Sequence, residues 1–103
     1  MKERGNDQFQ GDVTILFVED DANDVLLVSR ALSKCQLPAE AHFVHNPIEL
    51  RDYLLGAGKF SDRTEYPVPE VIMTDYKFCG GSARDVLQWV QRLDQFKNIP
   101  VVV

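Results

Sequence analysis

Residues 13–21 read VTILFVEDD, a stretch of six apolar or β-branched residues that ends abruptly in three carboxylates. A continuous apolar run, in place of alternating apolar and polar side chains, is typical of a strand buried on both faces of a parallel sheet. Asp21 is a suitable helix N-cap, and Asp24 three residues later completes a capping-box-like pair. The stretch therefore predicts a buried parallel strand that leads through an acidic turn into a helix.

The next segments contain residues that are typical of helix ends and helix starts. The first helix is expected to stop before Pro38, because proline disfavours helix in the residue before it. Asn46 as N-cap, Pro47 at the first helical position and Glu49 three residues after the cap predict the start of a second helix. Gly56 is expected to end that helix.

Further strands and a third helix complete the pattern. Residues 40–45 and 70–74 have the composition of strands, and residues 98–103 open a fourth strand. Ser82 is expected to cap a third helix, with Asp85 at its third position. Three strand–helix units followed by a strand predict an α/β fold, in which right-handed crossovers place helices on both faces of a parallel sheet.

Length and composition predict one ordinary globular domain. The chain has 103 residues, of which 45% are hydrophobic and 26% charged. Its net charge of -5 argues against a nucleic-acid surface, which needs clustered Lys and Arg. No apolar run approaches the roughly 20 residues that span a bilayer, and residues 1–11 lack the apolar core of a signal peptide. We expect a disordered polar leader over 1–11, a domain over 12–103, and a cytoplasmic protein without membrane contact.

Acidic residues follow two of the predicted strands. Glu19 and Asp20 follow the first strand, and Asp75 follows the third. In an open parallel sheet, ligands gather beyond the carboxyl ends of the strands, so neighbouring strands would bring these carboxylates together. Such like charges oppose one another's ionisation, and a hard divalent cation such as Mg²⁺ offsets their repulsion. The alternative is that they are solvated loop residues or helix caps, which we favour for Asp21.

Cysteine and histidine residues carry no comparable signal. Cys35 and Cys79 are too few and too far apart for a disulfide framework or a zinc site. His42 and His45 stand two apart in a predicted strand, but no third ligand lies near them in the sequence. No metal site is therefore expected at these residues.

Two of the quoted segments resemble those of a known family. Residues 15–21, ILFVEDD, resemble the acidic first-strand motif of response-regulator receiver domains, and residues 71–75, VIMTD, resemble the strand that carries their phosphoacceptor aspartate. The resemblance covers residues 12–103. It implies a flavodoxin-like (CheY-like) fold with strand order 2-1-3-4, in which the last strand and the last two helices are absent. The long loop over residues 55–69 is similar to that of single-domain regulators paired with phytochrome-like histidine kinases.

The resemblance also implies a site and a function. Glu19, Asp20, Asp75 and the backbone carbonyl of Lys77 would bind Mg²⁺, and Asp75 would accept a phosphoryl group as 4-aspartylphosphate. The donor would be a sensor histidine kinase or a phosphotransfer protein of a two-component phosphorelay. The chain would then be a phosphoacceptor regulatory domain and no enzyme.

Several positions depart from the family pattern. Cys79 stands where receivers usually have proline, and Ala83 stands where glycine is common. The Ser or Thr after the fourth strand and the Lys after the fifth strand, both used by the family, would lie beyond Val103. The sequence thus supports the metal site and the acceptor but not the complete switch. The fourth strand is expected to be exposed and to invite self-association.

Three other functions remain open at this point. A phosphotransferase of the haloacid-dehalogenase type also uses a strand-end Asp, but it requires a second Asp two residues later, where this chain has Lys77. A flavodoxin needs a Ser-, Thr- and Gly-rich first loop, whereas the acidic residues of 19–24 would repel a flavin phosphate. An inert pseudo-receiver or interaction fragment is the third alternative.

Overall fold

The computed structural model describes residues 13–35, 38–75, 77–78 and 81–103. In chain order the elements are β1 Val13–Val18, α1 Ala22–Cys35, β2 Ala39–Val44, α2 Pro47–Leu55, the short 3-10 helix η2 Gly58–Phe60, β3 Val71–Thr74, β4 Lys77–Phe78, β5 Gly81–Ser82, α3 Ala83–Arg92 and β6 Val101–Val102. This alternation confirms the predicted α/β class. The predicted leader over residues 1–11 and Cys79 lie outside the described residues.

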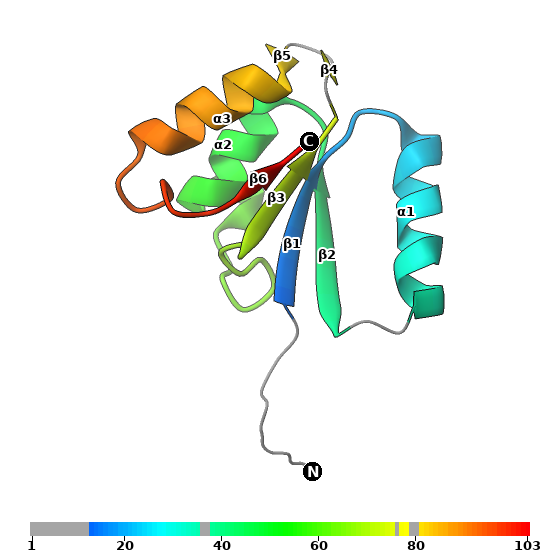
Figure 1. Ribbon diagram of the computed structural model, residues 1–103. Helices are drawn as coiled ribbons and strands as arrows, with labels where there is room; N and C mark the ends of the chain where they lie inside the picture. Colours follow the sequence, from blue (N-terminus) through cyan, green and yellow to red (C-terminus); the bar gives the residue numbers. More distant parts are fainter. Residues whose placement is uncertain (1–12, 36–37, 76, 79–80) are drawn as a thin grey trace.

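Four parallel strands form the main sheet, in the order β2-β1-β3-β6 (Figure 1). The central strand β1 places Val18 opposite Val44 of β2 and opposite Thr74 of β3. At the other edge, β6 pairs with β3 through Ile72 and Val101. The predicted order 2-1-3-4 is confirmed, with β6 as the fourth strand, although β6 is shorter than the predicted strand.

A second, two-stranded sheet follows β3. Strands β4 and β5 pair antiparallel, with Lys77 opposite Ser82 and Phe78 opposite Gly81. Helix α3 begins directly after β5.

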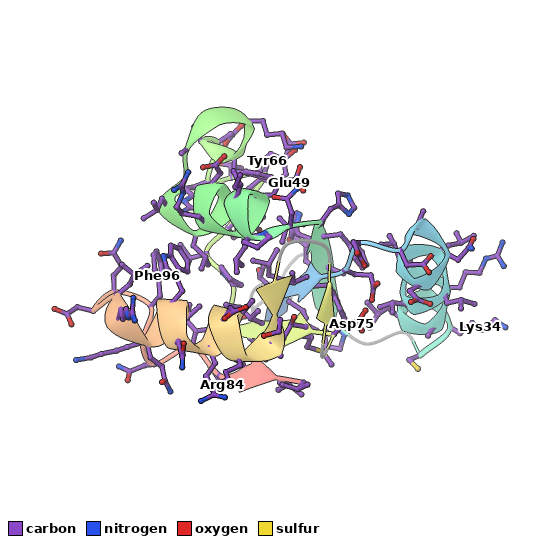
Figure 2. All side chains as sticks on the ribbon, turned by 90° about the horizontal axis from the view of Figure 1, so that it is seen from above. Lys34, Glu49, Tyr66, Asp75, Arg84 and Phe96 are labelled. Carbon is purple, nitrogen blue, oxygen red and sulfur yellow. The ribbon has the colours of Figure 1, made fainter. Side chains whose placement is uncertain are left out.

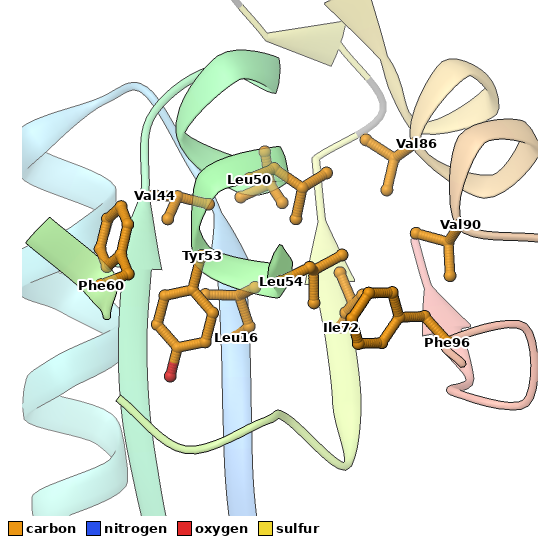
Figure 3. Close-up of a cluster of buried hydrophobic side chains, with 11 residues drawn as sticks. Leu16, Val44, Leu50, Tyr53, Leu54, Phe60, Ile72, Val86, Val90 and Phe96 are labelled. Atoms are coloured by element: carbon orange, nitrogen blue, oxygen red, sulfur yellow. The ribbon is translucent and has the colours of Figure 1, made fainter. Parts of the chain in front are cut away.

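The core lies on one side of the main sheet, between the sheet and the helices α2 and α3 (Figure 3). Helix α2 buries Leu50, Tyr53 and Leu54. Val86 and Val90 of α3 are buried with them. Leu87 of the same helix is 39% exposed. The buried cluster consists of Leu16, Val18, Val44, Leu50, Tyr53, Leu54, Phe60, Ile72, Val86, Val90 and Phe96.

Local capping explains where α2 and α3 begin and end. The Asn46 side chain accepts a hydrogen bond from the Glu49 backbone N–H at 2.8 Å, which satisfies a donor that the first helical turn leaves unpaired. Gly56 ends α2 with a φ of 68°, a left-handed conformation that glycine adopts without steric cost. Ser82 and Asp85 form a reciprocal capping box at the start of α3.

Helix α1 lies on the opposite side of the sheet from α2 and α3 (Figure 1). None of its residues is fully buried, and Leu26 and Leu27 are 49% and 60% exposed. The side of the sheet that faces α1 is therefore covered less completely than the side that faces α2 and α3. Among the described residues, no helix has the length and apolar character needed to cross a bilayer.

Candidate metal and phosphoacceptor site

The carboxyl ends of β1 and β3 lie side by side at one edge of the main sheet. Val18 pairs with Thr74 in the parallel ladder, so the residues that follow, Glu19 and Asp75, leave neighbouring strands at the same level. The Asp75 backbone N–H donates to the Val18 carbonyl at 3.4 Å, which keeps the two strand ends together. The predicted meeting of these two strand ends is observed.

Three carboxylates converge at this edge. One ligand atom each of Glu19, Asp24 and Asp75 lies within 4.8 Å of the other two. The Glu19 side chain is buried, that of Asp24 is half-buried and that of Asp75 is exposed. Seen from above, Asp75 lies on the side of the sheet that faces α1, the helix that carries Asp24 (Figure 2). The group thus combines residues from two strand ends and the first turn of a helix.

The convergence of like charges perturbs Glu19. Burial raises the pKa of Glu19 from its ordinary value of 4.5 to about 7, and a hydrogen bond with the Asp75 side chain adds to the shift. The charges of Asp75 and Asp24 act in the same direction, because they disfavour a further carboxylate nearby. The hydrogen bond from the Asp21 backbone N–H to Glu19 opposes the shift by stabilising the charged form. Near pH 7 the Glu19 carboxyl is therefore only partly ionised, and its surroundings disfavour the charged form.

The Glu19 backbone is fixed at both of its polar groups. Its N–H donates to the Val44 carbonyl at 2.9 Å, which extends the β1–β2 pairing by one step. Its carbonyl accepts a hydrogen bond from Nδ1 of His45 at 2.9 Å. Its side-chain Oε2 also accepts from the Asp21 N–H at 3.1 Å. The orientation of Glu19 is therefore determined by contacts with β2 and with the turn before α1.

The remaining predicted site residues lie around this group. Asp20 follows Glu19 in the same turn and is exposed, and it does not belong to the three-carboxylate group. Lys77 begins β4, two residues after Asp75. Asp21 caps α1 as predicted, since its side chain accepts from the Asn23 N–H at 2.8 Å.

Asp24 is the member of the group that the sequence did not predict. It was assigned to a capping box with Asp21, but the Asp21 N–H donates instead to Glu19. The Asp24 carboxyl lies with Glu19 and Asp75. A usable signal was present, because a residue in the first turn of a helix that starts at a strand's carboxyl end lies over the same edge as the strand-end residues.

A small cavity adjoins the carboxylates. It has a volume of about 210 Å³ and extends from Glu19 and Asp75 along the sheet to Phe17, Met73 and Val102. Apolar side chains thus line the space next to the acidic group on the side of the sheet that carries Met73 and Val102.

The chemistry of the donor set fits a hard divalent cation. Carboxylate oxygens are the ligands that Mg²⁺, Mn²⁺ and Ca²⁺ prefer. A cation would offset both the burial and the repulsion that raise the pKa of Glu19. Neither a thiol nor an imidazole belongs to the cluster found among the described residues, so the set does not resemble a zinc site.

No protein-family model and no curated protein matches the chain. Solved structures do match it. The bacteriophytochrome response regulator AtBRR is 35% identical with a TM-score of 0.78, over 90% of this chain and 66% of AtBRR. The phosphorylated cyanobacterial phytochrome response regulator RcpA is 27% identical with a TM-score of 0.75, over 88% of this chain and 63% of RcpA. The Mn²⁺-bound form of response regulator Rcp1 is 26% identical with a TM-score of 0.74, over 86% of this chain and 62% of Rcp1.

The chain spans less than two thirds of the length of each of these proteins. All three are response regulators, and each aligns with most of this chain. The strand order matches the order that the family resemblance implies. The parallel sheet, the acidic edge and these similarities together identify the chain as a response-regulator receiver domain, a module of two-component signalling.

Proposed function

We propose that Asp75 is the phosphoacceptor of this receiver domain and that the acidic edge binds Mg²⁺ for the transfer. The observation that carries the proposal is the convergence of carboxylates from neighbouring strand ends within 4.8 Å. Glu19, Asp20, Asp75 and the backbone carbonyl of Lys77 are the proposed ligands, and Asp24 lies close enough to contribute through the same cluster. Asp75 is the exposed member of the three-carboxylate group and is therefore open to a phosphoryl donor.

Phosphoryl transfer requires mainly that the protein position the reacting groups and neutralise their charge. A carboxylate oxygen of Asp75 forms the new P–O bond while the P–N bond to the donor imidazole breaks, and the departing imidazole nitrogen takes up a proton from solvent. The product is an acyl phosphate. A bound divalent cation supplies positive charge that offsets the charge of the transferring group. Burial of Glu19 beside the acceptor keeps one of the proposed ligands in place.

Similar proteins support both parts of the proposal. RcpA is described in a phosphorylated form and Rcp1 in a Mn²⁺-bound form. AtBRR and RcpA are response regulators of phytochromes. By analogy, we propose that the donor is the histidine kinase of a two-component system or a phosphotransfer protein that acts with it.

Phosphorylation by a small donor tests the proposal directly. The protein is incubated with Mg²⁺ and acetyl phosphate or phosphoramidate, and intact-mass spectrometry is expected to show the gain of one phosphoryl group. Asp75→Asn should abolish the gain. Asp94→Asn is the matched control, because the Asp94 side chain is 97% exposed and lies in the segment after α3.

The alternatives give different results in the same assay. An inert interaction module would gain no mass with either donor, even at saturating Mg²⁺. A phosphatase of the haloacid-dehalogenase type would release phosphate from a phosphoester in steady turnover. The first outcome would contradict the proposed acceptor role of Asp75, and the second would contradict the proposal that the chain is a regulatory receiver domain.

A further inference from the structure

His45 is the first residue after β2 and contacts the acidic edge from the neighbouring strand. Its Nδ1 lies 2.9 Å from the Glu19 carbonyl oxygen. A carbonyl oxygen only accepts hydrogen bonds, so Nδ1 carries the hydrogen and donates. The Glu19 N–H donates to Val44, the residue before His45. Both polar backbone groups of Glu19 are thus bonded to the end of β2.

The imidazole occupies a position that the parallel ladder leaves empty. In a parallel pair, a strand residue accepts from a backbone N–H further along its neighbour. Beyond Val44 the chain turns into α2, with Asn46 as its N-cap, so the ladder ends at that point. The His45 side chain supplies the missing donor, and the Glu19 carbonyl stays bonded although the neighbouring strand has ended.

His45 is itself held by the start of α2. Its backbone N–H donates to Oε1 of Glu49 at 2.8 Å, and the Glu49 N–H donates to the Asn46 side chain at 2.8 Å. Oε2 of Glu49 accepts from Nζ of Lys59 at 3.2 Å. Burial acts to raise the pKa of Glu49, but the hydrogen bonds from the His45 backbone and from Lys59 outweigh it and lower the pKa. The imidazole therefore projects from a backbone that the helix cap fixes.

The geometry points to His45 as a positioning residue for the metal site: its Nδ1–H holds the Glu19 backbone so that the Glu19 carboxylate stays beside Asp75. Repulsion from Asp75 and Asp24 favours displacement of Glu19 away from the group, and hydrogen bonds at both backbone groups of Glu19 oppose that displacement. Groups that orient a metal ligand from outside the coordination sphere contribute to metal affinity. This inference rests on the proposed metal-binding function.

Two substitutions at His45 separate the effect of the hydrogen-bond donor from the effect of the volume of the ring. His45→Leu keeps a branched side chain of similar reach but removes the hydrogen-bond donor. His45→Asn keeps an amide nitrogen near the position of Nδ1. With Mn²⁺ as the probe, followed by electron paramagnetic resonance, we expect His45→Leu to weaken binding about threefold to tenfold. We expect His45→Asn to stay within about twofold of the parent protein.

Tyr53→Phe is the matched control for a loss of stability. It also removes one hydrogen bond from a side chain to a backbone carbonyl, that of Pro67, but it does so in the core away from the carboxylates. It should lower the free energy of unfolding without changing the Mn²⁺ affinity. A fall in affinity in Tyr53→Phe equal to that in His45→Leu would show that stability alone is responsible and would overturn the inference.

The remaining outcomes distinguish a failure of the proposed metal-binding function from a failure of the inference about His45. If the parent protein binds no Mn²⁺, the proposed function fails, and the inference fails with it. If the parent binds Mn²⁺ and His45→Leu binds it equally well, only the inference fails. Equal weakening in His45→Leu and His45→Asn would likewise exclude the donor as the cause.

Discussion

The Glu19 carboxyl is the most strongly perturbed acid of the candidate site. Its pKa is raised to about 7 by burial and by the Asp75 side chain, against an ordinary value of 4.5. Between those two pH values the folded state binds more protons than the unfolded state. The stabilisation is therefore fully present at the acidic end of that range and is lost as the pH rises through about 7.

This shift predicts an unusual pH dependence of stability. With a chelator present, the free energy of unfolding should fall by about 1 to 2 kcal/mol as the pH rises from 4.5 to about 7. Glu19→Gln should flatten that part of the profile, because the titrating group is gone. Urea denaturation at several pH values measures both proteins. A profile that is identical in the two proteins would contradict the raised pKa.

Asp20 provides a second prediction at the scale of one residue. By the resemblance to receivers, the Asp20 carboxylate is a proposed Mg²⁺ ligand. Loss of a residue that only orients a metal ligand already weakens metal binding by about tenfold, so we expect Asp20→Asn to weaken Mg²⁺ binding by about tenfold or more. Isothermal titration calorimetry gives the affinity, and Asp94→Asn serves again as the exposed control. Unchanged affinity in Asp20→Asn would count against its role as a ligand.

At the scale of elements, the carboxyl end of α2 depends on one arginine from the following loop. Arg63 donates to the backbone carbonyls of Tyr53 and Leu54 at the end of α2, and to that of Tyr66 in the loop. Gly56 lies directly beneath the guanidinium, since a Cβ at this position would lie 3.0 Å from Nε of Arg63. The loop and the helix end are thus joined through a single half-buried side chain.

Removing this arginine should therefore be costly. Arg63→Ala leaves helix-end carbonyls without their charged donor, and we expect the free energy of unfolding to fall by about 2 kcal/mol. Arg51→Ala is the matched control, because Arg51 is exposed and its ion pair with Asp52 spans 3.9 Å. Equal effects of the two substitutions in urea denaturation would refute the capping role of Arg63.

At the scale of the whole molecule, the two faces of the sheet are covered unequally. The buried cluster lies on the side of α2 and α3, whereas Met73 and Val102 are 36% and 44% exposed. Among the described residues, β6 is one of the two edge strands of the main sheet, next to β3. Exposed apolar side chains beside an edge with unpaired backbone groups favour association with another copy.

The 103-residue chain should consequently self-associate as its concentration increases. Val102→Lys should weaken the association, since a charge at the edge opposes strand pairing. Val68→Lys is the control, because Val68 is 47% exposed but lies in the loop before β3. Sedimentation velocity measures the three proteins. A parent chain that stays monomeric, with a sharp, reversible and concentration-independent unfolding transition, would contradict the prediction.

The limits of sequence-based prediction are clearest at Asp24 and His45. Asp24 was assigned to a helix cap and His45 to a strand with no metal role, and both assignments used only near neighbours in the sequence. The structure brings Asp24 to Glu19 and Asp75, and it brings His45 to the backbone of Glu19, 26 residues away. The contact between His45 and Glu19 leaves no local pattern to read, whereas the place of Asp24 in the first turn of α1 offered a usable signal.

By itself, the sequence determined the alternation of strands and helices, the caps at Asn46 and Ser82, and the carboxylates at the ends of β1 and β3. These features follow from local backbone preferences and from the burial of apolar runs, which depend on residues a few positions apart. Tertiary structure alone decided which carboxylates lie next to Glu19, which arginine caps α2, and how unequally the two faces of the sheet are covered. Each of those depends on how strands in register and packed helices bring distant residues together.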